Sequence, residues 1–118
     1  MGRDPRRAVA LAQAFVQATN AGEVERCASM LAETAAAYGA QGRHEVATFM
    51  ASFRQRHPGL RYECRDWRAE ECDAGARVKF AFTRYCDDEA NRASGVEVVT
   101  VDAQTQLITS IDVKLDDA

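Results

Sequence analysis

The amino-acid sequence changes its period once, at Pro58-Gly59. Before this dipeptide, apolar residues recur three and four positions apart, which is the spacing of amphipathic helices. From Leu60 onward they alternate in twos, which is the spacing of half-buried strands. Strands that follow one another through short turns pair as antiparallel hairpins. The sequence therefore predicts an α+β fold in which N-terminal helices pack on one face of a curved antiparallel sheet.

Three helices are expected before the change of period. Asp4 is a suitable N-cap for the first helix, and Pro5 suits its first turn. Asn20 and Glu23 resemble a capping box, which predicts the start of a second helix. A short extended piece is expected at 35–38, and a third helix is expected from about Arg43 to His57.

The strand region begins with a segment that is polar on both faces, which is typical of a sheet edge. The next segment alternates cleanly, with Val78, Phe80 and Phe82 on one face. Polar turns separate the segments. The expected strands are 60–71, 76–86, 96–101 and 107–115.

Length and charge limit the possible functions. The 118 residues fit one domain, 1–118, without repeats or linkers. A net charge of −3 gives no general attraction to nucleic acid or anionic lipid. No apolar run is long enough to span a membrane, and the first residues lack a signal-peptide pattern, so we expect a cytoplasmic protein.

The four cysteines and two histidines lack metal-ligand spacing. We therefore expect no metal, no cofactor and no disulfide.

Three stretches resemble a known superfamily: Ala14 to Glu23, Tyr38 to Phe49 with Gly42-Arg43-His44-Glu45-Val46, and the closing Leu107 to Asp116. Their order is similar to that of ketosteroid isomerase, SnoaL-type polyketide cyclases, limonene epoxide hydrolase and nuclear transport factor 2. The resemblance covers nearly the whole chain. It implies a cone-shaped, cystatin-like α+β roll with an apolar pocket, and often a dimer formed through the sheet. Since the last strand also has an apolar face of Ile111, Val113 and Leu115, we expect a homodimer.

Ketosteroid isomerase chemistry needs a carboxylate base, together with a tyrosine and a protonated carboxylic acid that hold an enolate oxygen. Under this resemblance the tyrosine position is Phe15, the base position is Gly39, and the acid falls near Glu97. Two of the three roles are empty, which excludes that isomerase mechanism.

Limonene epoxide hydrolase offers a second comparison. The resemblance matches its tyrosine to Tyr38, the arginine of its Arg-x-Asp to Arg84 and its last-strand carboxylate to Asp112. Cys86 replaces the second carboxylate, so the acid–base pair of that enzyme is incomplete. If the chain is an enzyme, the resemblance implies that Asp112, Tyr38 and Arg84 are the catalytic residues.

Each of these residues has a structural alternative. Asp112 alternates with Ile111 and Val113, so it points to solvent if the apolar face is the core side, and into the cone otherwise. Tyr38 can be a core tyrosine with its hydroxyl at the rim. Arg84 can be a surface cation or a loop anchor.

We expect the chain to bind or convert a small apolar molecule, by isomerase, cyclase or hydrolase chemistry. The expected apolar walls are Phe15, Phe49, Phe53, Phe80 and Phe82. The alternative is a non-catalytic, homodimeric interaction module of the same fold. An open pocket that contains Tyr38, Arg84 or Asp112 favours the first function, and a pocket plugged by Met30, Phe49 or Met50 favours the second.

Basic and aromatic residues also interleave between Arg54 and Arg68, a pattern found in proteins that bind single-stranded nucleic acid. Acidic residues interrupt this run, so a soluble sheet edge explains it better. We expect no nucleic-acid partner.

Overall fold

The computed structural model of the chain describes residues 4–116. Helix α1 spans Pro5–Ala21, and the side chain of Asp4 caps it by accepting a hydrogen bond from the Arg6 N–H at 2.9 Å, as predicted. Gly22 ends α1 at a φ of 75°, a conformation that glycine adopts without strain. Helix α2 spans Val24–Ser29, and no side chain caps its start. The capping role predicted for Asn20 was therefore wrong.

A hairpin separates α2 from the third helix. Strand β1 spans Leu31–Ala37 and strand β2 spans Ala40–Gln41, so the predicted extended piece belongs to a longer strand. Helix α3 follows at Arg43–Arg56. Residues 4–116 thus contain the three expected helices, but these do not precede the sheet as one block, because β1 and β2 come before α3.

The second half of the chain forms long strands near the predicted positions. They are β3 at Arg61–Glu71, β4 at Gly75–Tyr85, β5 at Ala93–Asp102 and β6 at Ile108–Leu115. A short 3-10 helix, η1 at Glu89–Asn91, lies in the loop between β4 and β5.

All the strands join one sheet in the order β2-β1-β6-β5-β4-β3. The predicted edge strand β3 is an edge of this sheet. The expectation of a purely antiparallel sheet was wrong in one place, because β1 pairs with β6 in parallel.

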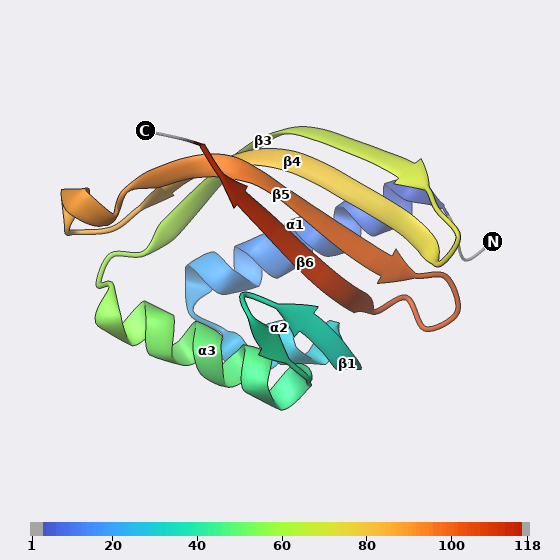
Figure 1. Ribbon diagram of the computed structural model, residues 1–118, viewed down its shortest axis with the longest axis horizontal. Coiled ribbons are helices and arrows are strands. Elements are labelled where there is room, and N and C mark those ends of the chain that lie inside the picture. The colour runs from blue at the N-terminus through green and yellow to red at the C-terminus, as the bar shows by residue number, and fades with distance from the viewer. Residues whose placement is uncertain (1–3, 117–118) are drawn as a thin grey trace.

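The sheet is curved and partly open. In Figure 1 the strands β3 to β6 arch over α1, while α2 and α3 lie beside β1 below them. Helix α1 packs on β3 and β4, and α3 packs on β1 and α2. Phe80, Leu31 and Ile108 are almost fully buried in the core between these layers.

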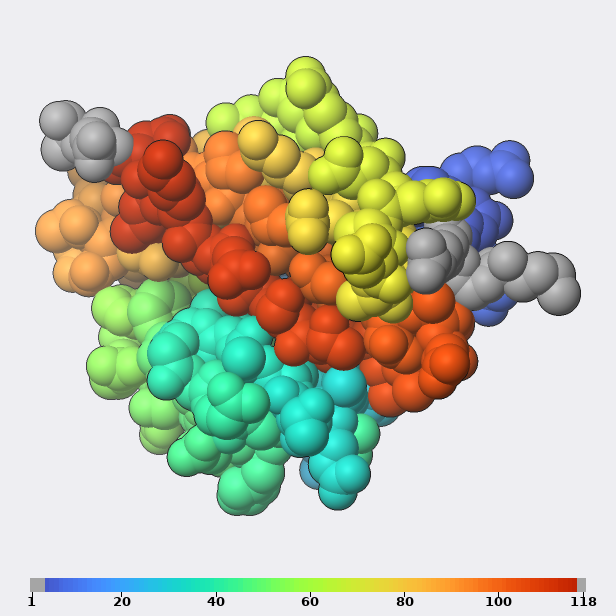
Figure 2. All heavy atoms as spheres, turned by 45° about the vertical axis from the view of Figure 1, so that its right-hand side comes forward, coloured from blue at the N-terminus to red at the C-terminus, as the bar shows by residue number. Residues whose placement is uncertain are grey.

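Strand β6 crosses one face of the molecule in Figure 2, above the surface formed by β1, β2 and α3. Its pairing with β5 shifts between Thr100 and Val101, so both Ile108 and Ile111 are buried although they are three residues apart. Within residues 4–116, no helix combines the length and the apolar character needed to cross a bilayer.

Candidate functional site

A cavity of about 300 Å³ lies between α1, α3 and the concave face of the sheet. Small-molecule sites in proteins commonly begin at about this volume. Phenylalanines from both layers form its apolar walls: Phe15 from α1, Phe49 and Phe53 from α3, and Phe82 from β4. All four were predicted from the sequence to line a pocket, and the structure brings them together around this cavity.

The fifth predicted phenylalanine lies elsewhere. Phe80 is 1% exposed and stacks on Trp67 of β3, with 4.2 Å between the ring centroids. It is not among the described residues that line the cavity. The alternation along β4 put Phe80 on the correct face but did not specify where along that face the core ends and the cavity begins.

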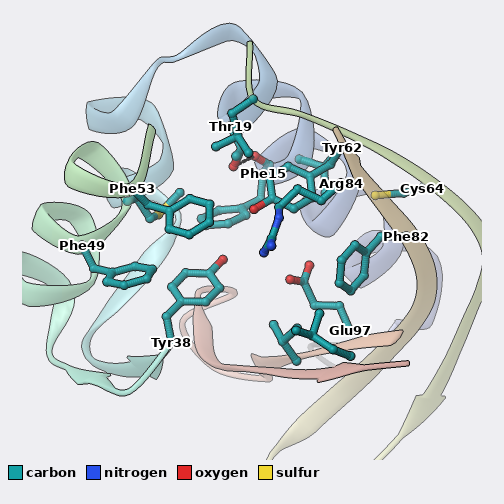
Figure 3. A pocket seen from close by; sticks show the side chains of 15 residues that line it. Phe15, Thr19, Tyr38, Phe49, Phe53, Tyr62, Cys64, Phe82, Arg84 and Glu97 are labelled. Atoms are coloured by element: carbon teal, nitrogen blue, oxygen red, sulfur yellow. Dashed lines mark hydrogen bonds between the residues drawn. The ribbon is translucent and has the colours of Figure 1, made fainter. Parts of the chain in front are cut away.

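Glu97 is the carboxyl group in the cavity lining. Strand β5 places it on the concave face of the sheet, opposite Phe80 of β4 and Val113 of β6. Figure 3 shows its carboxyl group pointing into the cavity. Burial among apolar side chains raises the pKa of Glu97 to about 7, because the charged form loses hydration there.

No described residue donates a hydrogen bond to the Glu97 carboxyl. Within residues 4–116, every side-chain oxygen or nitrogen atom that is fully enclosed does have a hydrogen-bond partner, so the Glu97 oxygen atoms are not fully enclosed. Its oxygen atoms therefore face the open space of the cavity, where they are free to bind a ligand.

Tyr38 reaches the cavity from the turn between β1 and β2. Tyr38 and Gly39 have φ angles of 56° and 79°, which is the pattern of a two-residue type I′ hairpin. A tyrosine rarely adopts a positive φ, so its side chain is held over the cavity by a strained backbone. Burial and then the charge of Glu97 raise the pKa of the Tyr38 hydroxyl well above its usual range. The hydroxyl therefore stays protonated and is a hydrogen-bond donor.

Tyr62 enters the lining from β3, and the sequence reasoning did not select it. Two hydrogen bonds between the Tyr62 backbone and the Asn20 side chain hold this part of β3 against α1. Burial raises the pKa of Tyr62 to about 12, an effect that the nearby Arg84 charge opposes. Cys64, two residues further along β3, also lines the cavity, and burial raises the pKa of its thiol to about 12.

Arg84 occupies the end of β4 and lines the cavity as the resemblance implied. Its Nε and Nη2 atoms donate to the carbonyl oxygen of Asn91 at 3.2 and 3.1 Å. Its guanidinium carbon lies 5.2 Å from the centre of the Phe53 ring. Arg84 therefore anchors the β4–β5 loop, one of the predicted alternatives, and also presents a positive charge to the cavity.

Asp112 does not share this space. It is exposed, whereas its neighbours Val113 and Leu115 line the cavity. Because successive residues of a strand point to opposite faces, Asp112 lies on the convex side of the sheet. Of the two orientations that the sequence left open, the structure has the solvent-facing one.

The sequence did contain a signal for Glu97. The ketosteroid isomerase resemblance put the oxyanion-holding acid near this residue, and Glu97 is a single carboxylate within Val96-Glu97-Val98-Val99. A charged residue inside a valine-rich strand is a candidate for burial or function. No comparable pattern marked Tyr62 or Cys64, because β3 is rich in charges on both sides.

No family model matches the sequence. A search of curated proteins also found no match.

Solved structures with the same arrangement were found. A protein of unknown function with a cystatin-like fold from Methylobium petroleophilum PM1 aligns with a TM-score of 0.80 and 13% identity over 98% of this chain and 79% of that one. A candidate ketosteroid isomerase from Kribbella flavida aligns with a TM-score of 0.73 and 20% identity, over 98% of this chain and 82% of that one.

A candidate isomerase of the SnoaL-like family from Agrobacterium tumefaciens aligns with a TM-score of 0.72 and 20% identity, over 95% of this chain and 99% of that one. The cystatin-like α+β fold expected from the resemblance is thus confirmed. The chain has the cystatin-like α+β fold that is shared by these SnoaL-like and ketosteroid-isomerase-like proteins.

Proposed function

We propose that this chain binds a small, mostly apolar molecule that carries an oxygen atom, and that Glu97 exchanges a proton with it. The observation that carries the proposal is the Glu97 carboxyl, which faces an apolar cavity of about 300 Å³ without a hydrogen-bond partner among the described residues. An unpartnered polar group in such surroundings is costly, and a polar ligand atom would satisfy it.

The pKa of Glu97 suits proton transfer. A group with a pKa of about 7 is present in both forms near neutral pH, so it can accept a proton and return it. In an isomerase-type reaction, the Glu97 carboxylate would take a proton from a carbon next to a ligand carbonyl. The Tyr38 hydroxyl would donate a hydrogen bond to the carbonyl oxygen as it gains charge, and Glu97 would return the proton to the ligand.

The exchange of carbon-bound protons for deuterium tests this proposal. 2-Tetralone, a two-ring ketone with acidic protons beside its carbonyl group, is incubated in heavy water and followed by proton NMR. We expect wild-type protein to accelerate the exchange and Glu97→Gln to abolish the acceleration. Asp112→Asn is the matched control, because it neutralises an exposed carboxylate on the other face of the sheet. Equal rates for the wild type and Glu97→Gln would contradict the proposal.

The alternative, a homodimeric interaction module, has one observation in its favour. Val113 and Leu115 are 41% and 48% exposed at the end of β6. Apolar side chains grouped at a surface favour association. The open cavity supports ligand binding instead, since Phe49 and Met50 line it and leave it unfilled. Light scattering at micromolar concentration tests the dimer, and Val113→Lys with Leu115→Lys should dissociate one that forms through this end of β6.

A further inference from the structure

We propose that the ligand of this cavity is an apolar carboxylate, with its carboxylate group held by Arg84 and its apolar body against the rings of α3. This inference rests on the proposed function and specifies the chemical class of the ligand. Figure 3 shows the guanidinium group of Arg84 directed toward the space that the Tyr38 hydroxyl and the Glu97 carboxyl also face.

Arg84 carries a positive charge that no ion pair within the described residues neutralises. The ion pairs within residues 4–116 involve Arg6, Arg26, Arg61 and Arg77, and none involves Arg84. Its Nε and Nη2 atoms share one backbone carbonyl oxygen, which carries only a partial negative charge. A guanidinium group has further N–H donors at Nη1 and Nη2. Arg84 therefore faces the cavity with its formal charge uncompensated by a described carboxylate.

The surroundings of the Arg84 charge are mostly apolar. Arg84 lies over the Phe53 ring and beside an apolar lining, where a cation without a counterion is less well solvated than at the open surface. A carboxylate matches the planar fork of arginine and forms charge-assisted hydrogen bonds with it. An anionic ligand would thus supply the counterion that the described protein lacks at this point.

Glu97 lines the same cavity as Arg84. The structure shows no ion pair between Arg84 and Glu97 within 4.0 Å. Because burial raises the pKa of Glu97 to about 7, this carboxyl is neutral in a large fraction of the protein molecules at pH 7. A neutral carboxyl donates a hydrogen bond to an anion and does not repel it. The protonated phenol of Tyr38 offers another donor.

Aromatic rings beside Arg84 offer a surface for the apolar body of the ligand. Tyr38, Phe49 and Phe53 form a continuous row of rings, with centroid separations of 5.4 and 5.7 Å. Arg84 lies at the Phe53 end of this row. A ligand with its carboxylate at Arg84 and a ring system along Phe53 and Phe49 would bury its apolar part and keep its charge beside the cation.

The test compares two ligands that differ in charge and hardly in shape. Isothermal calorimetry at pH 6.5 measures the binding of naphthalene-2-carboxylate and naphthalene-2-carboxamide to the full chain. Cyclohexanecarboxylate and cyclohexanecarboxamide form a second pair of the same kind. We expect the carboxylate to bind more tightly than its carboxamide by about 10- to 100-fold, the usual effect of a charge-assisted hydrogen-bonded pair. In Arg84→Gln we expect the carboxylate to bind no more tightly than the carboxamide, while the carboxamide affinity changes little.

Two variants make the result specific. Arg84→Lys keeps the positive charge but loses the planar guanidinium group, so it should keep part of the preference for the carboxylate over the carboxamide. Arg92→Gln removes an exposed positive charge from the same β4–β5 loop and should leave this preference unchanged. Circular dichroism and a thermal melt check that each variant is folded, and the carboxamide affinity reports on the shape of the cavity independently of charge.

The outcomes separate this inference from the proposed function. If carboxamides and carboxylates bind the wild type equally, or if Arg84→Gln keeps the preference, the carboxylate assignment is overturned and the proposed function survives. If no member of either pair binds and 2-tetralone does, the cavity takes neutral ketones only and the carboxylate assignment is again overturned. If none of these compounds binds, the proposed function and this inference fail together.

Discussion

Asn20 and Tyr62, which are 42 positions apart in the sequence, exchange two hydrogen bonds. The Tyr62 N–H donates to Asn20 Oδ1 at 2.7 Å, and Asn20 Nδ2 donates to the Tyr62 carbonyl oxygen at 2.9 Å. One amide side chain at the end of α1 thus satisfies both backbone groups of a residue on the edge strand β3. This pair of hydrogen bonds, called the Asn20–Tyr62 clamp below, also fixes the backbone of a tyrosine that lines the cavity.

Replacing Asn20 with alanine should lower the free energy of unfolding by about 1–3 kcal/mol, because it leaves a partly buried backbone donor and acceptor without partners. Urea unfolding followed by circular dichroism measures the change. Gln17→Ala, at an exposed position on the same helix, is the control and should shift stability by no more than about 0.5 kcal/mol. Equal effects of the two substitutions would show that the clamp contributes no stability.

Arg54 secures the same corner from α3. Its Nη1 atom donates to the Thr19 carbonyl oxygen at 2.9 Å, and its Nη2 atom donates to that of Asn20 at 3.3 Å. These carbonyls lie in the last turn of α1, where a positive charge is favourable, and the Thr19 oxygen also accepts a hydrogen bond from the Gly22 N–H at 3.1 Å. The end of α1 is therefore tied to both β3 and α3, the two elements that flank the cavity.

The buried Glu97 predicts how stability depends on pH. Its pKa is about 7 in the folded chain and 4.5 in an unfolded reference, so the folded state binds more protons between these values. Its contribution to stability is therefore largest below pH 4.5 and declines as the pH rises through 7, by about 3 kcal/mol in total. Well above pH 7 this contribution no longer changes, because Glu97 is then ionised in both states.

Glu97→Gln should remove this decline. We expect the difference in unfolding free energy between pH 5 and pH 8 to be smaller in the variant than in the wild type by about 2–3 kcal/mol. Asp112→Asn, which neutralises an exposed carboxylate, should follow the wild-type pH dependence. Urea melts of the three proteins in matched ionic strength decide the matter, and parallel curves for all three would mean that Glu97 titrates as an ordinary exposed carboxyl.

Truncation of Phe80 should mainly lower stability, whereas truncation of Phe49 should mainly weaken ligand binding. Phe80 is 1% exposed and stacked on Trp67, so Phe80→Ala should cost about 3–5 kcal/mol of unfolding free energy through the cavity that it leaves. Phe49 is partly exposed and already borders open space, so Phe49→Ala should cost less stability and weaken ligand binding more. Chemical unfolding together with calorimetric titration separates the two effects. A larger loss of stability from Phe49→Ala would place the core differently from the structure.

Much of the fold follows from local patterns. The switch of period at Pro58-Gly59 predicted the boundary between α3 and β3, and the alternation of Val78, Phe80 and Phe82 predicted the buried face of β4. Such features depend on neighbours in the sequence, so the residues themselves display them.

The parallel pairing of β1 with β6 could not be predicted in this way. It joins Leu31 to Ile108, and long-range pairing leaves no periodic signal in either segment. Asn20 was misassigned for a similar reason: a local capping pattern was present, but its side chain bonds to β3, far along the chain.

The candidate site was predicted in part. Tyr38 and Arg84 were found through the family resemblance, and their side chains do meet around the cavity. Asp112 was selected because the resemblance matched it to the last-strand carboxylate of limonene epoxide hydrolase. Both Asp112 and Glu97 alternate with apolar residues, and alternation alone does not say which face of a strand is concave. Only the packing of α1 and α3 on one face of the sheet makes that distinction.

Tyr38→Phe tests the role of the hydroxyl without altering the shape of the ring. No described residue forms a hydrogen bond with this hydroxyl, so its removal should leave the free energy of unfolding within about 0.5 kcal/mol of the wild type, or raise it. If the hydroxyl donates to a ligand oxygen, the same change should weaken the binding of that ligand by about 3- to 10-fold. Tyr85→Phe, whose hydroxyl accepts only a long contact from Arg92 at 3.4 Å in the β4–β5 loop, is the control and should leave binding unchanged. Unaltered affinity in Tyr38→Phe, with both variants folded, would mean that the strained turn at Tyr38 serves packing against Phe49 and not recognition of the ligand.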